Sequence, residues 1–469
     1  MNRECLYPNT TGHSHPSQSI ETNLSAHKQT YAGFQDESKQ NTRPLKNSFL
    51  FLLTFVGFLF PFISQAQIEV GAEIRPRTEF RNGYQDPVGT DGISPEFVTT
   101  QRSRLFVGYE NNKITGKISF QDVRTWGEST TKSDAATLHL HEAWFEFPLI
   151  DSLRLQMGRI EISYDNERLL ATTNWHNIGS QHDLAIFKYE TKKMQGHIGL
   201  AYNNQVGGAL EESNYPIPYY KALGYLWLKY NLNKQLNFSI IAIDEANPVA
   251  THDTKYYNRL TAGANIWANP IDNLKVNIEG YVQLGKNKAG KSVEAYMFNF
   301  RADYKVMDML TPFAGIDMYS GNDPNNPTRK TAQFDRLYGA KHKYYGYMDY
   351  FPSVQNGLID NYIGANIKPL KKTSVEVALH GFMLPGRHID PSAPSENLKN
   401  TLGAELDIKV GYKIAPDLSV MGLFGMLKGT KTMDVVKGGD HKELNNYVAV
   451  MLTYKPKFRG QTIPEMKKQ

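Results

Sequence analysis

The sequence predicts an all-β protein, a transmembrane antiparallel up-and-down β-barrel of about 18 strands, within a range of about 16–18. Three observations lead to this fold class. A short apolar segment near the amino terminus resembles an export signal, apolar and polar residues alternate along many segments, and the connections between those segments alternate between short and long. A soluble sandwich or propeller would not separate the connection lengths so regularly.

The apolar segment 49–63 is the nearest approach to a membrane-spanning helix, but it is shorter than the roughly 20 residues that a helix needs to cross a bilayer. The basic residues Arg43 and Lys46 precede it, and a Ser-Gln-Ala triplet ending at Ala66 follows it. A basic region, a short apolar region and small residues at the cleavage point make up a secretory signal. We therefore predict a signal peptide over residues 46–66, cleaved near Ala66, with an uncleaved anchor as the alternative.

Residues 1–45 form a polar leader without periodicity, which indicates either a disordered extension or a misassigned start. The single cysteine, Cys5, lies in this leader, so the predicted mature barrel, residues 67–469, has neither disulfides nor a thiolate metal site. It also lacks the cysteine that a lipoprotein anchor requires. A net charge of +5 over the whole chain does not suggest a nucleic-acid partner.

Alternation of apolar and polar residues is the main evidence for strands. In residues 67–81, QIEVGAEIRPRTEFR, the apolar Ile68, Val70, Ala72 and Ile74 alternate with charged or small residues. Side chains of a strand point alternately to its two faces, so one face is apolar and the other is charged. A lysine or arginine that faces lipid at the bilayer midplane costs about 2–4 kcal/mol, so we predict that the charged face lines a polar lumen. The predicted strands are 67–81, 102–110, 114–121, 138–147, 153–159, 183–190, 195–202, 221–230, 235–243, 260–267, 274–284, 293–306, 311–319, 362–368, 373–384, 401–414, 418–427 and 444–454.

The connections fall into two classes. Short ones contain Asn, Asp or Pro, which favour turns because Asn and Asp bond their own backbone and Pro presets φ. The short connections are 111–113, 151–152, 232–234, 271–273 and 415–417, and the long ones include 82–99, 159–182, 320–334 and 385–400. Short periplasmic turns at one rim and long extracellular loops at the other are typical of an outer-membrane barrel.

Arginine is dense in the early strands, together with glutamate. The predicted pore-lining residues are Arg75, Arg77, Arg81, Arg102, Arg104, Arg124, Arg159, Arg168, Glu73 and Glu79. Arg124 lies where the alternation slips, as it does at a bulge or a strand end. Guanidinium groups around a constriction would favour anionic solutes. The alternative is an arginine–carboxylate ladder that only braces the lumen, with Glu161 as a further partner.

Two long motifs carry a family resemblance. The run 158–169, GRIEISYDNERL, is followed by Trp175 and Asp183, and the stretch 334–349 contains FDRLY and then HKYYGYMD. Both resemble the bacterial alginate-export porin family, apart from Ile160, which replaces the usual glutamine. The resemblance implies a single-chain 18-stranded barrel whose arginine-rich pore, in the family's namesake, passes an anionic polyuronate outward. It carries functional roles to Arg159, Tyr164, Asp165, Arg168, Asp183, Asp335, His342 and Asp349 and adds Asp165 and Asp183 to the predicted pore set.

The sequence therefore predicts a monomeric, passive outer-membrane porin, not an enzyme, for anionic or polar solutes, including acidic saccharides such as alginate. The other expected partners are outer-membrane lipid and the barrel-assembly machinery, and no cofactor or metal is expected. One alternative is a phospholipase-like barrel enzyme, for which Asn174, His176, Ser180 and His182 are the nearest candidates. The other is a structural barrel that does not conduct.

Overall fold

The computed structural model describes residues 67–90, 94–111, 113–129, 137–203, 220–249, 252–323, 330–351, 353, 355–386, 388–390 and 393–459. The predicted leader, 1–45, and the predicted signal peptide, 46–66, lie outside the described residues. All described residues belong to one compact unit, which spans residues 64–469.

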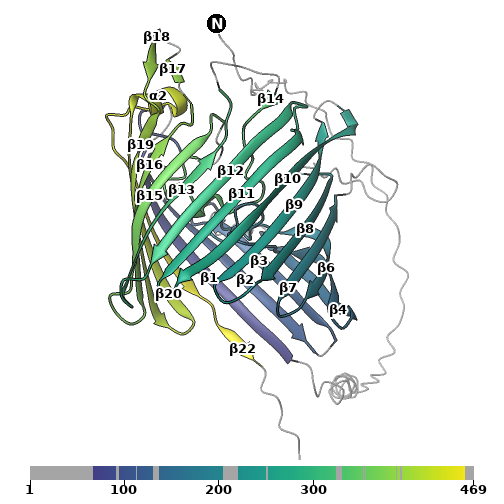
Figure 1. Ribbon diagram of the computed structural model, residues 1–469. Helices are drawn as coiled ribbons and strands as arrows, with labels where there is room; N and C mark the ends of the chain where they lie inside the picture. The colour runs from purple at the N-terminus through teal and green to yellow at the C-terminus, as the bar shows by residue number, and fades with distance from the viewer. Residues whose placement is uncertain are drawn as a thin grey trace, which may run out of the picture. The chain divides into compact units, whose positions relative to one another are not determined.

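Eighteen strands of the described chain form a closed antiparallel barrel (Figure 1). They are β1 (Gln67–Asn82), β2 (Glu96–Glu110), β3 (Thr115–Thr125), β4 (His139–Ile150), β5 (Leu153–Ile160), β6 (His182–Glu190), β7 (Met194–Tyr202), β8 (Ala222–Asn231), β9 (Leu236–Val249), β10 (His252–Ile271), β11 (Leu274–Lys286), β12 (Ser292–Tyr304), β13 (Leu310–Tyr319), β15 (Leu358–Ile367), β16 (Thr373–Met383), β19 (Thr401–Ala415), β20 (Leu418–Gly429) and β21 (Asn445–Tyr454). Each strand pairs with the next, and β1 also pairs with β21, which closes the barrel.

Each of the predicted strands corresponds to one of these strands, so the predicted fold class is confirmed. Several strands are longer than predicted: β2 begins at Glu96 rather than at residue 102, and β10 begins at His252 rather than at residue 260. The extra residues lie at the long-loop rim, where the alternation that identifies lipid-facing positions fades. A strand can continue there without an apolar face, because water can reach both of its faces.

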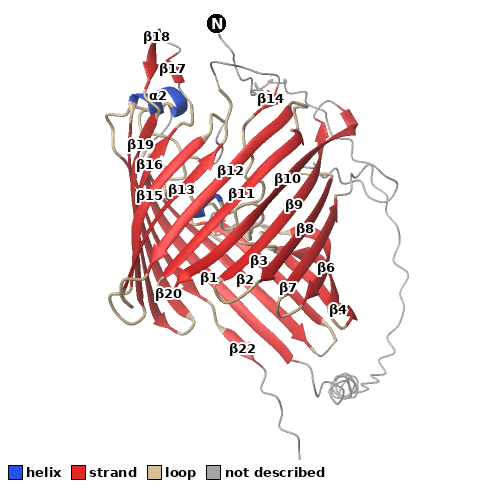
Figure 2. Ribbon diagram, in the orientation of Figure 1, coloured by secondary structure: helices blue, strands red, loops and turns tan. Residues whose placement is uncertain are grey.

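A few short elements lie outside the barrel ladder. β14 (Lys330–Thr331) pairs with the start of β12, and β22 (Lys457–Arg459) pairs with residues 69–71 of β1. The hairpin of β17 (His388–Asp390) and β18 (Ala393–Leu398) and the helix α2 (Lys431–Lys437) lie at the long-loop rim (Figure 2). No helix among the described residues is long and apolar enough to cross a membrane.

Burial follows the predicted alternation in β1. Glu73, Arg75 and Glu79 are buried on the inner face, whereas Ile68 and Ile74 are 47% and 45% exposed on the outer face. On β12, however, the first part of the inner face is apolar, with Val293, Ala295 and Met297 buried, and the polar Asn299 and Arg301 follow further along it. The expectation of a polar lumen face along every strand was therefore wrong, because part of the inner wall packs against protein rather than water.

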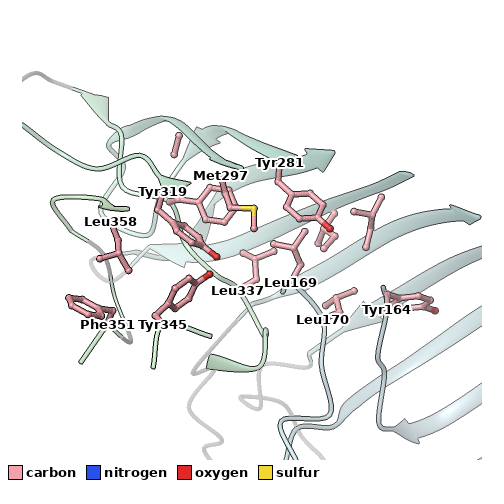
Figure 3. Packing of buried hydrophobic residues seen from close by; sticks show 14 of the residues in the cluster. Tyr164, Leu169, Leu170, Tyr281, Met297, Tyr319, Leu337, Tyr345, Phe351 and Leu358 are labelled. Atoms are coloured by element: carbon pink, nitrogen blue, oxygen red, sulfur yellow. The ribbon is translucent and has the colours of Figure 1, made fainter. Parts of the chain in front are cut away.

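Two connections of the described chain fold into the barrel. Lumen loop A is the 161–181 connection between β5 and β6, and lumen loop B is the 332–357 connection between β14 and β15, which contains the short helix η1 (Lys341–Lys343). Apolar side chains of both loops pack together with side chains of the wall (Figure 3). The labelled members of this inner core are Tyr164, Leu169, Leu170, Leu337, Tyr345 and Phe351 from the loops and Tyr281, Met297, Tyr319 and Leu358 from strands.

The outer face provides a test of the barrel. Leu105 of β2 is 52% exposed and lies in the middle of the apolar outer face, whereas Ile150 lies at the short-turn rim. We expect Leu105→Arg to lower the free energy of unfolding in lipid bilayers by about 2–4 kcal/mol and Ile150→Arg by about 0–1 kcal/mol, because the cost of a cation falls towards the interface. Equal effects of the two changes in denaturant titrations would contradict this orientation.

Candidate functional site: the lumen

Arginines of β1 and β2 hold one end of lumen loop A. Arg75 Nη1 donates to the Asn174 carbonyl oxygen at 2.6 Å, and Arg77 Nη1 donates to the Trp175 carbonyl oxygen at 2.7 Å. Arg102 Nη2 donates to the Asn174 side-chain oxygen at 2.8 Å. Three guanidinium groups of the wall therefore satisfy backbone and side-chain acceptors of a loop that would otherwise lie unpaired inside the barrel.

Two predicted glutamates neutralise these arginines. Glu73 accepts a hydrogen bond from Arg102 Nε at 2.7 Å. Glu79 lies between two cations, 3.3 Å from Arg77 and 2.7 Å from Arg81. Both carboxylates are buried, so their pairing offsets a desolvation cost that neither charge could bear alone.

Arg104 pairs with the first residue of lumen loop A. Its Nη1 lies 3.3 Å from Glu161 Oε1, and the same carboxylate oxygen is 2.7 Å from His141 Nε2. Glu161, offered in the sequence only as a bracing partner, is thus a shared anion between two strands. This contact supports the bracing interpretation for Arg104.

Arg168 forms the central ion pairs of lumen loop A. The side chain is buried, and Nη2 donates to Asp317 Oδ1 at 2.7 Å, while Nε contacts Glu279. Nη1 donates to the Tyr345 hydroxyl of lumen loop B at 2.8 Å. Although burial opposes the charged form, the carboxylates of Asp317 and Glu279 raise the pKa of Arg168 well above its usual value. The residue therefore connects both loops to β11 and β13.

Asp165 fixes the other end of lumen loop A. Its Oδ1 accepts hydrogen bonds from Trp227 Nε1 at 2.9 Å and from the Ser239 hydroxyl at 2.8 Å. Burial raises the pKa of Asp165, and these two donors oppose that shift only in part. The neighbouring Tyr164 hydroxyl lies 3.0 Å from His197 Nδ1 and 2.9 Å from the Tyr225 hydroxyl. The first family motif is thus a set of anchors between the loop and the wall.

The second motif anchors lumen loop B. Asp335 lies 2.7 Å from Arg259 Nη1, and Nη2 of the same arginine pairs with Glu245. At the far side of the lumen, the backbone N–H of Tyr347 donates to Asp407 at 3.0 Å, and that of Met348 donates to Glu405 at 2.8 Å. Carboxylates of β19 therefore accept from loop amides, as helix caps do elsewhere.

The two lumen loops meet each other directly. The Tyr338 N–H donates to the Leu169 carbonyl oxygen at 2.9 Å, and the Ala340 N–H donates to the Glu167 carbonyl oxygen at 2.8 Å. Trp175 and His342 stack nearby, with ring centroids 4.0 Å apart. The loops thus form one partition, attached to the wall through several strands.

Three residues of the predicted pore set do not join this cluster. Arg124 is exposed and pairs with Asp122 of its own strand at 2.7 Å. Arg159 pairs with Asp183 at 2.8 Å, and both are substantially exposed, while their sequence neighbours Ile160 and His182 are buried. The strand parity places the Arg159–Asp183 pair on the face opposite to the inner cluster, although Asp183 borders the cavity at its margin.

Residues that the sequence did not single out complete the site. Glu279, Asp317, Glu405 and Asp407 are buried carboxylates on the inner faces of β11, β13 and β19. The alternation within each predicted strand could have identified them, since each stands on the face opposite to exposed apolar residues. Their partners could not be identified, because these lie on loops far away in the sequence.

A cavity of about 1570 Å³ runs beside the loops. Its lining extends from Thr125 and Glu128, at the long-loop rim, to Ala268 and Asn269, beside the short turn between β10 and β11. It therefore follows the lumen from one end of the barrel towards the other. Cations and carboxylates both line it; the cationic side chains include Arg77, Lys275, Arg301, Lys341, Lys343 and Lys409.

Two ionisable groups report on the potential inside this cavity. Burial lowers the pKa of His176, and the Arg77 and Arg75 guanidinium groups lower it further. Burial also lowers the pKa of Lys341, and the Arg336 guanidinium adds to the shift. The His176 and Lys341 side chains both line the cavity. Neighbouring guanidinium groups therefore add to burial in disfavouring the protonated form of each side chain.

A family model described as alginate export matches residues 66–421 of this chain. The chain belongs to the alginate export family. The resemblance carried by the two sequence motifs is thereby confirmed. A comparison with curated proteins found no match.

Solved structures share the fold of this alginate export family member. OccAB1 of Acinetobacter baumannii has a TM-score of 0.59 at 13% identity, covering 84% of this chain and 97% of its own. OccK1 (OpdK) of Pseudomonas aeruginosa has a TM-score of 0.58 at 9% identity, covering 83% of this chain and 99% of its own. OpdK, described as an outer membrane protein, was also crystallised with vanillate, with a TM-score of 0.57 at 10% identity, covering 83% of this chain and 99% of its own. Family and fold together assign this protein to the outer membrane as a porin-type barrel.

The candidate metal and hydrolase residues of this alginate export family member have other contacts. Among the described residues, His141, Glu142 and Glu161 form one group close enough to hold a cation, and Asp434, Asp440 and His441 form another. In the first group, Arg104 and Lys117 already neutralise the two glutamates. Of the hydrolase candidates, the Ser180 hydroxyl pairs with Thr173 at 2.7 Å and His182 pairs with Tyr220 at 2.9 Å, rather than with each other.

The buried Arg168 node and the exposed Arg159 pair make a matched test. Arg168→Met would leave Glu279 and Asp317 buried without their cation, so we expect it to lower the opening free energy of lumen loop A by about 3–5 kcal/mol. Arg159→Met should cost about 0–1 kcal/mol, because its pair is exposed. Hydrogen exchange of residues 161–181 measures both effects. Similar protection in the two variants would contradict the central role of Arg168.

Asp165 makes the stability of lumen loop A depend on pH. Because its folded-state pKa is raised, the folded loop holds the proton more tightly than the unfolded chain. Stability should therefore fall as pH rises from the usual aspartate pKa through the raised value. Asp165→Asn keeps the oxygen acceptor for Trp227 and Ser239, so we expect this slope to vanish without loss of stability at pH 7. Hydrogen exchange across this pH range would contradict the assignment if the slope persisted.

Proposed function

We propose that this barrel is a passive porin for anionic or polar solutes, including acidic saccharides, that diffuse through the cavity beside the two lumen loops. The observation that carries the proposal is the cavity itself, whose lining reaches residues near both rims of the barrel. No energy-coupling element is needed for solutes that move down their gradient. One chain closes the barrel, so we propose that it acts as a monomer.

The preference for anions rests on the charges that line the cavity. The arginines of the inner cluster divide into two groups. Arg102 and Arg168 are buried in pairs with carboxylates and brace the structure. Arg75 and Arg77 donate to loop carbonyls, although Arg77 also lies 3.3 Å from Glu79, and both guanidinium groups add to the burial that lowers the pKa of His176. Together with the lysines of lumen loop B that line the cavity, Lys341 and Lys343, these guanidinium groups would attract a carboxylate-bearing solute.

Two comparisons support the solute class. The family is described by its export of alginate, an acidic polysaccharide, and one structure of similar fold was crystallised with vanillate, an aromatic carboxylate. Both solutes carry the carboxylate group that arginine and lysine recognise. We propose that this protein handles the same chemical group, with the direction of transport set by the solute gradient.

Charge reversal at Lys341 tests the anion preference. Lys341 of lumen loop B lines the cavity, whereas Lys192 lies at the short turn between β6 and β7 and is exposed. In planar bilayers with a salt gradient, we expect a reversal potential that indicates anion preference, and Lys341→Glu should shift it towards cations. Lys192→Glu carries the same charge change and should leave it unchanged.

The outcomes separate the alternatives. A wild-type channel that prefers cations would overturn the anion part of the proposal while leaving the porin intact. A barrel that inserts and does not conduct would favour the structural alternative. Lipid hydrolysis by the purified protein, lost in Ser180→Ala, would favour the hydrolase.

A further inference from the structure

A row of stacked side chains links the two lumen loops at the surface of the cavity. The Arg77 guanidinium lies 4.3 Å from the centroid of the Trp175 ring. The Trp175 ring stacks on His342 with a centroid distance of 4.0 Å and an interplanar angle of 8°, and His342 stacks on Tyr347 at 5.4 Å and 25°. We call Arg77, Trp175, His342 and Tyr347 the lumen stack.

The lumen stack joins two separate parts of the barrel wall. Arg77 belongs to β1, and the Tyr347 hydroxyl donates to Glu376 of β16 at 2.9 Å and accepts from Lys409 of β19 at 3.0 Å. Around the barrel, β20 and β21 lie between β19 and β1. The stack therefore forms a short chord on one side of the lumen, with one ring from loop A and two rings from loop B.

The chord borders the open part of the lumen. Arg77, Trp175, His342, Tyr347 and Lys409 all line the cavity. The second junction of the loops is formed by the contact between Leu170 and Tyr338 and by the buried Arg168 node; Leu170 is not among the residues that line the cavity, whereas Arg168 and Tyr338 also border it. The loops therefore have two junctions, a buried one that fixes their fold and the stack, which meets the passage.

His342 is held in the lumen stack mainly by its neighbours. Its Nδ1 lies 2.9 Å from Asp349 Oδ2, and the Tyr84 hydroxyl donates to the same oxygen at 2.5 Å. Its Nε2 is buried and has no hydrogen-bond partner within the described part of the chain. The ring faces, rather than hydrogen bonds on that side, therefore position the imidazole between Trp175 and Tyr347.

We propose that the lumen stack sets the size limit of the passage. The inference rests on the proposed porin function and specifies which side chains determine the solutes that pass. Trp175 fills the space between a wall arginine and a loop B histidine, so its removal opens the chord at its middle. The buried junction stays in place, because it shares no side chain with the stack.

Liposomes containing the full barrel test this inference with neutral saccharides of increasing length, which separate size from charge. We expect Trp175→Ala and His342→Ala to admit saccharides that the wild type excludes. His342→Phe, which keeps an aromatic ring in the stack, should retain the wild-type limit. Trp267→Ala is the matched control, since Trp267 lines the cavity from β10 and stands outside the stack.

Hydrogen exchange at residues 168–171 checks the buried junction in the same variants. Wider uptake with wild-type exchange supports the proposal. An unchanged size limit in Trp175→Ala would overturn the proposed role of the stack and leave the porin function standing. Wider uptake together with faster exchange at residues 168–171 would also overturn that role, because the stack would then only brace the loops. If the wild type is closed to ions and Trp175→Ala conducts, the stack is a complete barrier and the open-porin proposal fails alone. If neither conducts, both proposals fail.

Discussion

The structure depends on one constraint: a charge taken out of water must be paired. Arg168 meets it with two carboxylates from β11 and β13 and a hydroxyl from lumen loop B. Either carboxylate alone in that position would be a buried anion without compensation. The pairing therefore requires the loop to enter the barrel, because only the loop supplies the cation.

The same constraint explains why the inner wall is partly apolar. A barrel filled with water would show polar side chains along every inner face. Here the loops bring Leu169, Leu170 and Leu337 into the lumen. Apolar side chains of the wall, such as Met297, belong to the same buried cluster. The result is a small hydrophobic core inside a membrane barrel, next to a cavity that keeps its charged lining. One side of the two loops packs against the wall and makes the partition rigid. The other side borders the cavity.

Arginine has two kinds of partner in this lumen, although all four of the guanidinium groups of Arg75, Arg77, Arg102 and Arg168 are buried. A fully paired and buried guanidinium contributes structure and little field, as at Arg102. Arg75 and Arg77 instead donate to carbonyl oxygens of lumen loop A, and Arg77, which also lies 3.3 Å from Glu79, borders the cavity. We propose that the two interpretations that the sequence left open, a selective pore and a bracing ladder, apply to different arginines.

The sequence by itself determined the barrel and its strand count, because the bilayer forces a period of two on every strand that faces lipid. It also identified Arg75, Arg77, Arg102 and Glu73 as an inward set through that parity. Parity did not place Arg124, Arg159 and Asp183: Arg159 stands on the face opposite to Gln156 and Ile160, and Arg124 and Asp183 lie near strand ends, where both border the cavity. The course of the 161–181 and 332–357 connections was decided only by the tertiary structure, since their partners lie far away in the sequence: 62 positions separate Asp165 from Trp227, and 149 separate Arg168 from Asp317. No local pattern encodes contacts of that range.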